Sequence, residues 1–438
     1  MRVPTAAERS GDLSALAVSI FDPLSAEGAA LTPERRAQFP GNRIPASRLS
    51  PQAQRLLARI PLPNIATAIG DQPNYVASGT ERNTEHQFNT RFDSYVTSKL
   101  HLFGRFSFAD YSKDAPPIFG PVGGGRGFDA ASPFAGLSDV RNLSLAVGFD
   151  YTVSPTLLTD FRFGWFRYGV QVRPKGLGSN PAQEAGIPGL NVDERTSDMP
   201  GMFINGFAGF QFGYALPINR CNCPLDQNER QFQVVNNWSK LRGDHTFKFG
   251  ADIRRALNLR VPSDRHRSGQ LNFNPERTAG PPGGGLGLAS FLLGDVSSFE
   301  RYVSSFFDAE ERQNRWFFFG QDTFRVNPKL TLTYGLRWEL YFPETVTGNR
   351  KGSWLRLATG ELFIAGDNGV NRRGNVETNF TTLAPRLGIA YQLNPKTVIR
   401  TGYGRSFLSW RVRIAVWLCR HAESSCAGYR GAKSGQCV

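Results

Sequence analysis

Few residues in this chain have the types and spacing that could support chemistry. Cys221 and Cys223 form a C-x-C pair, but a tetrahedral metal site needs a second pair of ligands, and none follows this spacing. A loop disulfide and two free thiols remain as the interpretations. The five histidines are dispersed and form no H-x-x-H or H-E-x-x-H motif, so zinc chemistry has no support. They are His86, His101, His245, His266 and His421.

Two glycine-rich runs, Gly120–Gly127 and Gly280–Gly287, invite comparison with phosphate-binding loops. A nucleotide loop connects a strand to a helix and ends in Lys followed by Ser or Thr, and neither run does. Both runs are interpreted as flexible loops. No G-x-S-x-G motif is present, so a hydrolase nucleophile has no support. We predict that the chain is not an enzyme, and we assign no catalytic, cofactor-binding, metal-binding or substrate-binding residue and no cofactor.

Charged side chains instead recur at alternate positions within apolar segments. In Leu143–Val153, apolar side chains occupy the odd positions and small or polar side chains the even positions. A period of two places successive side chains on opposite faces of a strand. One face is apolar and often aromatic, and the other is small, polar or charged. This pattern predicts a wall with hydrocarbon on one side and water on the other.

The alternation assigns particular residues to each face. We predict that one group shares the apolar outer face: Leu143, Leu145, Val147, Phe149, Leu332, Tyr334, Leu336 and Trp338. We predict that a second group forms interstrand charge networks inside a channel: Arg91, Asp93, Arg105, Arg162, Asp252, Arg254, Arg337, Glu339, Arg386 and Arg400. Direct contact with a ligand is the alternative role for these charges. Arg or Lys on the lipid side costs about 2–4 kcal/mol at mid-bilayer.

The strand-like segments come in pairs joined by turns of three or four residues. The predicted hairpins are Phe88–Val96 with Leu102–Phe108, Leu143–Val153 with Thr159–Trp165, Phe232–Trp238 with Phe247–Ile253, Trp316–Phe324 with Leu330–Phe342, and Leu383–Leu393 with Val398–Phe407. The connections between hairpins are far longer, at about 112–142, 169–230, 255–312 and 343–379. Short periplasmic turns and long extracellular loops are typical of an outer-membrane barrel. We therefore predict an all-β fold, an antiparallel transmembrane β-barrel that is partial and open.

Three regions follow from this pattern. Residues 1–83 are predicted to be an irregular segment leading into the barrel, with a short helix within Pro51–Ile60. Residues 84–408 are the partial barrel domain, and Met202–Tyr214 and Ser290–Val303 could add strands to it. Residues 409–438 hold Cys419, Cys426 and Cys437, and we expect no barrel strand there. A frameshifted, disordered tail and a genuine tail with disulfides are both open.

Composition limits the functional classes. The chain has 438 residues, a net charge of +14 and 12% aromatic residues. It holds no run of about 18 apolar residues, so no membrane helix is predicted. No apolar signal segment follows Met1, and we interpret the amino end as missing. The basic residues are scattered rather than clustered, so nucleic acid is not an expected partner. A channel interior and outer-membrane lipid explain the charge better.

Several segments together resemble a known family. They are VPTAAERSGDLS, FPGNRIPASRLSPQAQRLLARIPLPN, NTRFDSYVTSKLHLFGRFSFAD, KLRGDHTFKFGADIRR, SFLLGD, FFFGQDTFRVNPKLTLTYGLRWELYFP and LAPRLGIAYQLNPKTVIRTGYG. Their order and spacing resemble the Oar-like β-barrel of TonB-dependent outer-membrane transporters, over residues 3–408. The resemblance implies an address in the outer membrane of a Gram-negative bacterium. It also implies that the parent protein works with the TonB complex.

The resemblance is partial. Family barrels have about 22 strands around a plugged lumen. The plug and the TonB box are absent here, and fewer strands are clear. We therefore interpret the chain as a central fragment of a transporter barrel. The complete parent transporter is expected to import a large nutrient, such as a glycan, a peptide or a metal chelate.

Two other functions remain open. An outer-membrane structural or adhesion barrel would use the long loops to bind ligands without active transport. A soluble all-β protein, such as a propeller or a glycan-active enzyme, is the third possibility. A propeller would show regular four-stranded blades, whereas these strands come in pairs with unequal connections.

Overall fold

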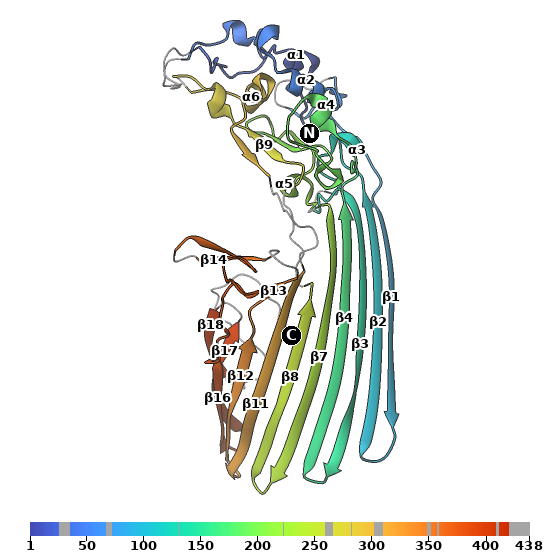
Figure 1. Cartoon of the computed structure of the whole chain (residues 1–438), viewed down its shortest axis with the longest axis vertical. Helices are drawn as coiled ribbons and strands as arrows, with labels where there is room; N and C mark the ends of the chain where they lie inside the picture. Colours follow the sequence, from blue (N-terminus) through green and yellow to red (C-terminus); the bar gives the residue numbers. More distant parts are fainter. Residues whose placement is uncertain are drawn as a thin grey trace.

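The computed structural model describes residues 1–438 except 26–35, 67–71, 130, 222, 259–265, 282, 302–309, 348–351, 357–358, 409–410 and 420–438. Its main feature is a tall, curved, antiparallel sheet of 12 strands (Figure 1). The order is β1-β2-β3-β4-β7-β8-β11-β12-β16-β17-β18, and the short strand β13 pairs with β11. Consecutive strands of the sheet therefore lie next to one another. The predicted all-β, antiparallel fold class is confirmed.

The five predicted hairpins are all present, and most of their strands run beyond the predicted ends. They are β1 (Arg82–Tyr95) with β2 (Leu100–Ala115), β3 (Gly136–Ser154) with β4 (Leu157–Arg173), β7 (Leu225–Arg242) with β8 (His245–Leu257), β11 (Glu311–Asn327) with β12 (Leu330–Tyr341), and β16 (Leu383–Asn394) with β17 (Thr397–Leu408). The strands extend into polar sequence because backbone pairing continues where the apolar pattern has ended.

The short turns lie at one end of the sheet (Figure 1). In the turn after β11, the Asn327 side chain accepts hydrogen bonds from the Lys329 and Leu330 amides, each at 2.9 Å. Asn394 accepts from the Lys396 amide at 2.9 Å in the turn after β16. An Asn side chain bonded to the backbone two residues on stabilises a tight turn. The two Asn-Pro-Lys sequences therefore form equivalent hairpin ends.

At the opposite end, the described parts of residues 1–80, 116–135, 174–224 and 266–300 fold together into what we call the lobe (Figure 1). It contains a small sheet of order β10-β9-β5-β6. Its strands are β5 (Gly201–Ile204), β6 (Gln211–Phe212), β9 (Gln270–Phe273) and β10 (Ser298–Glu300). Its helices are α1 (Ala6–Arg9), η2 (Pro40–Asn42), η3 (Ala46–Arg48), α2 (Pro51–Leu57), α3 (Gly120–Gly123), α4 (Pro181–Ala185), η4 (Glu194–Thr196), α5 (Leu216–Asn219), η5 (Pro275–Thr278) and α6 (Gly287–Leu293).

The lobe has a hydrophobic core of its own. Helix α2 confirms the short helix that was predicted within Pro51–Ile60. Its residues Leu56 and Leu57 pack in one buried cluster with Phe212 and Phe291. Phe291 of α6 meets Phe212 edge-on, with ring centroids 6.0 Å apart. The long connections are therefore not independent loops, because segments far apart in sequence share this core.

Two candidate strand regions have other structures. Met202–Tyr214 forms β5 and β6, but these belong to the lobe sheet and not to the large sheet. The expected pairing of Ser290–Val303 is wrong for its first residues, which end helix α6, while β10 pairs with β9. Gly294 stops the helix in a left-handed conformation with φ +72°, which favours glycine. The buried face of α6 therefore decides its structure.

The expectation that residues 409–438 add no strand is wrong for Arg411–Cys419, which form β18 and pair with β17. The physical reason is visible in the sequence, since positions 412, 414, 416 and 418 are all apolar. Cys426 and Cys437 lie outside the described residues. In the described part of the chain, β1 and β18 each have one hydrogen-bonded neighbour, so the sheet is open, as predicted.

Smaller elements complete the described chain. β13 (Thr345–Val346) extends the pairing of β11, and β14 (Ser353–Arg356) pairs with β15 (Glu361–Ile364) in a separate two-stranded sheet. None of the helices described here is both long and apolar enough to cross a membrane.

Candidate functional site

The register of the large sheet separates two faces. Leu145 lies opposite Phe106 on β2 and Trp165 on β4. Continuing across the strands, the partners on this side remain mostly apolar as far as Leu336 on β12. All eight residues predicted to share the outer face lie on this side, which we call the apolar face. That prediction is confirmed.

The opposite side, which we call the polar face, carries all ten charges that the alternation placed together. Arg105 lies opposite Arg91 and Ala146, and Arg162 lies opposite Gly148 and Val235. The same parity continues through Asp252, Glu339 and Arg400. Glu339 is buried, but the other nine charges are partly or fully exposed, so the polar face is accessible to water.

A chain of charge contacts crosses the polar face from β1 to β4. Arg91 pairs with Asp93 at 2.6 Å. The His101 ring links two strands, with Nε2 2.9 Å from Asp93 and Nδ1 3.3 Å from Asp150. Arg162 continues the chain, 3.9 Å from Asp150. Each acid therefore lies between two groups that can donate a hydrogen bond, which keeps like charges apart.

The chain extends to β7 through Asp160. Arg162 Nε lies 3.4 Å from Asp160, and the Asn237 side chain donates to the same carboxylate at 3.0 Å. Histidines were considered in the sequence only as metal ligands, and the role of His101 was missed. Its alternation with Phe103 and Arg105 places it on the polar face, which was the available signal.

A second cluster surrounds Phe317 on β11. The guanidinium carbons of Arg254 and Arg337 lie 5.5 Å and 4.9 Å from the ring centroid. Arg254 pairs with Asp252 at 2.7 Å, and Arg337 pairs with Glu339 at 2.9 Å. Cation–π contact and ion pairing together hold both arginines against the wall. The polar face is therefore ordered without a covering core.

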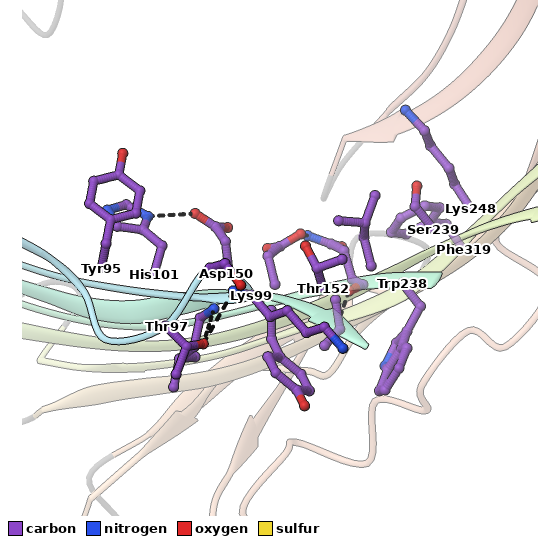
Figure 2. A pocket seen from close by; sticks show the side chains of 17 residues that line it. Tyr95, Thr97, Lys99, His101, Asp150, Thr152, Trp238, Ser239, Lys248 and Phe319 are labelled. Carbon is purple, nitrogen blue, oxygen red and sulfur yellow. Dashed lines mark hydrogen bonds and ion pairs between the residues drawn. The ribbon is translucent and has the colours of Figure 1, made fainter. Parts of the chain in front are cut away.

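A pocket of about 680 Å³ opens on the polar face near the short turns. Figure 2 shows Tyr95 and His101 side by side, with His101 joined to Asp150; the two rings stack with centroids 4.6 Å apart. Lys248 and Phe319 lie at the other side of the pocket. Aromatic rings beside charged and amide groups can bind a polar solute by stacking and hydrogen bonding.

The cysteine pair and the two glycine-rich runs that the sequence singled out lie in the lobe. Cys221 and Cys223 form a disulfide, which selects one of the two interpretations. The glycine-rich runs lie in contact with other lobe segments: Gly124 packs against Gly213, and Gly285 against Pro275. Within the described residues, no group of three His, Cys, Asp or Glu side chains is placed to hold a metal ion.

Burial perturbs titratable groups in the lobe. Asp198 is completely buried, and burial raises its pKa well above the usual value, although the Met199 amide donates to it at 2.8 Å. Burial also raises the pKa of Tyr214, which donates to the Pro121 carbonyl at 2.7 Å. Both groups belong to the lobe, and neither lines the pocket on the polar face.

Comparison with known proteins gives one matching family and several similar solved structures. The family model described as an outer membrane beta barrel domain matches residues 1–416. Among solved structures, the ferric-catecholate import receptor Fiu from E. coli in its open form has 11% identity and a TM-score of 0.36, covering 74% of this chain and 47% of that one. The ferripyoverdine receptor of Pseudomonas aeruginosa has 11% identity and a TM-score of 0.37, covering 75% and 36%. No curated protein matches. This chain spans less than half the length of these two structures.

Proposed function

This chain belongs to the outer membrane β-barrel domain family, and from that premise we propose that it forms part of the wall of a transporter that imports a large nutrient. The observation that carries the proposal is the polar face. Its charges form ion pairs both within strands and between neighbouring strands, and most of them remain partly exposed, which suits the lining of a water-filled passage. A soluble sandwich would instead bury an apolar layer between two sheets.

The open edges of the sheet support the fragment interpretation. In hydrocarbon, each unpaired backbone N–H or C=O group costs several kcal/mol. We therefore propose that further strands complete the wall beside β1 and β18. A completed wall with more strands than these 12 encloses a wide lumen, because barrel diameter grows with strand number. A wide lumen suits a large solute such as a glycan, a peptide or a metal chelate.

Energised import through the TonB complex is the mechanism we propose for the complete protein. The resemblance of the hairpin segments to Oar-like transporters supports this mechanism. The passage must open for the solute and remain closed to smaller molecules, and coupling to the energised inner membrane would supply that control. The lobe lies at the long-loop end of the wall (Figure 1). We propose that the solute first contacts the protein there.

The test compares the source bacterium with a strain lacking the gene. Uptake of labelled oligosaccharide, peptide and ferric chelate is measured with and without a protonophore. We expect the deletion to abolish uptake of one class, and the protonophore to have the same effect in the parent strain. Unchanged uptake of all three classes overturns the proposal. Loss of surface attachment with normal uptake would identify an adhesion barrel instead.

A variant test locates the passage. Asp150→Asn with Lys248→Gln removes two charges that line the pocket on the polar face. We expect this variant to lower uptake severalfold while reaching the outer membrane in normal amount. The matched control is Lys396→Gln in the exposed turn after β16, which should leave uptake unchanged. Equal uptake by both variants would show that this pocket does not lie on the route of the solute.

A further inference from the structure

A row of arginines crosses the apolar face near its loop end. They lie on the adjacent strands β3, β4, β7, β8 and β11, and they are Arg141, Arg167, Arg230, Arg255 and Arg312. Arg167 lies directly opposite Arg230. Leu257 lies opposite both Arg230 and Arg312. Arg167, Arg230 and Arg312 therefore lie in one row across the sheet. We call this set the arginine belt.

The belt lies immediately beyond the apolar part of the same face. Two residues toward the short turns, Arg167 gives way to Trp165 and Arg230 to Phe232, which lie opposite each other. Ile253 and Trp316 are likewise paired below Arg255 and Arg312. Trp side chains favour the boundary between hydrocarbon and head groups. The belt therefore marks the height at which hydrocarbon ends on the loop side of the wall.

The belt carries more positive than negative charge. Arg141 pairs with Asp110 at 2.8 Å, and Arg312 with Glu310 at 3.2 Å. Arg167 donates to the neutral Asn228 side chain at 3.0 Å. Among the described residues, no carboxylate lies within ion-pair distance of Arg230 or Arg255. Uncompensated guanidinium groups facing lipid are costly in hydrocarbon but favourable beside anionic head groups.

A pocket of about 230 Å³ lies at one end of the belt. Arg255 and Arg312 line it together with Arg373 from the connection before β16, and Phe342 and Pro343 form an apolar part of its wall. The Arg312 Nε is buried and has no hydrogen-bond partner among the residues that the structure describes. Guanidinium groups bind phosphate oxygens through paired hydrogen bonds. The pocket thus offers donors for a phosphate group beside an apolar surface.

We propose that the arginine belt and this pocket bind the phosphate groups of lipids in the outer leaflet of the membrane. A lipid suits the site better than free phosphate, because the Trp and Phe side chains directly below the belt can contact acyl chains while the arginines hold the head group. Loop-side position, surplus charge and the adjoining apolar face all fit this one occupant. This role in lipid contact is independent of what the passage transports.

The test uses the protein isolated from outer membranes and placed in phosphatidylcholine nanodiscs. Binding of lipid A carrying its phosphates is compared with binding of dephosphorylated lipid A. We expect a clear preference for the phosphorylated form in the wild-type protein. In the variant Arg255→Gln, Arg312→Gln and Arg373→Gln, we expect about a hundredfold weaker binding, since each arginine near a charged surface contributes roughly fivefold.

The control variant removes three charges from the polar face instead: Arg105→Gln, Arg386→Gln and Arg400→Gln. It should bind phosphorylated lipid A as the wild type does. Equal loss in both variants, or equal binding of both lipid forms by the wild type, overturns the proposal. Displacement of lipid A by inorganic phosphate would identify a free-anion site and also overturn it. Heat-modifiable electrophoretic mobility checks that each variant has folded. The comparison of the two lipid forms uses only the wild-type protein, so it tests the proposal even if a variant does not fold.

Discussion

Gly213 lies so close to Pro200 that a β-carbon on Gly213 would stand 1.9 Å from the Pro200 carbonyl oxygen. Gly213 also has φ +81°, in the region that favours glycine. Its amide donates to the Gly123 carbonyl at 2.9 Å, and its carbonyl accepts from the Gly125 amide at 2.9 Å. Gly213 is therefore the point where three segments of the lobe meet without side chains between them.

Gly213→Ala should destabilise the lobe by at least about 3 kcal/mol, because the new methyl group forces the backbone of two segments apart. The matched control is Gly209→Ala, at φ +70° with open space around the position, which should cost only about 1–2 kcal/mol. Proteolysis in increasing urea measures both changes. Equal effects of the two substitutions would show that close approach at Gly213 has no energetic weight.

Asp198 should make the lobe less stable as the pH rises. Burial raises the pKa of Asp198 in the folded protein, so the unfolded chain ionises first. Stability is then greatest below the unfolded pKa of about 4 and falls by about 1.4 kcal/mol per pH unit until the folded pKa is reached. Asp198→Asn should abolish this decline and stabilise the lobe at neutral pH.

The pH profile of lobe proteolysis in urea measures the Asp198 effect. Asp129→Asn, at an exposed position, serves as the control and should keep the wild-type profile. If Asp198→Asn also keeps that profile, another group causes the decline.

Phe291 should be the largest single contributor to the lobe core among the residues tested. It is 1% exposed and meets Phe273 edge-on at 5.0 Å. Phe291→Ala leaves a cavity and should cost about 3–5 kcal/mol. Phe299→Ala on β10, where the ring is 51% exposed, should change stability by at most about 0.5 kcal/mol. Hydrogen exchange resolved by segment should show the loss in the lobe and leave β3 and β4 protected.

A new positive charge should destabilise the protein on the apolar face of β3 but be tolerated on its polar face. Leu145→Arg places a cation on the apolar face and should cost about 2–4 kcal/mol in the bilayer. Ser144→Arg, one residue away on the polar face, should be tolerated because that side faces water. The fraction of protein that reaches a heat-modifiable form in outer membranes measures both. Similar losses from both substitutions would contradict the assignment of faces.

Strand positions and faces could be read from the sequence because both depend on neighbouring residues. The alternation in Leu143–Val153 needs no distant partner, and the eight residues assigned to the apolar face do share it. The Asn-Pro-Lys turns are equally local. In Arg411–Cys419 the same signal was present but was outweighed by the three cysteines of residues 409–438, one of which, Cys419, ends the strand that was missed.

The sequence by itself thus determined an antiparallel wall with one apolar and one polar face, since a period of two is a property of each strand alone. Only the tertiary structure decided which charges meet: His101 touches both Asp93 and Asp150 because the register of three strands aligns them. Only the tertiary structure assembled the lobe, whose core joins Leu57 to Phe291 across more than half of the chain. Local sequence cannot specify such contacts, because they depend on which distant apolar surfaces bury one another.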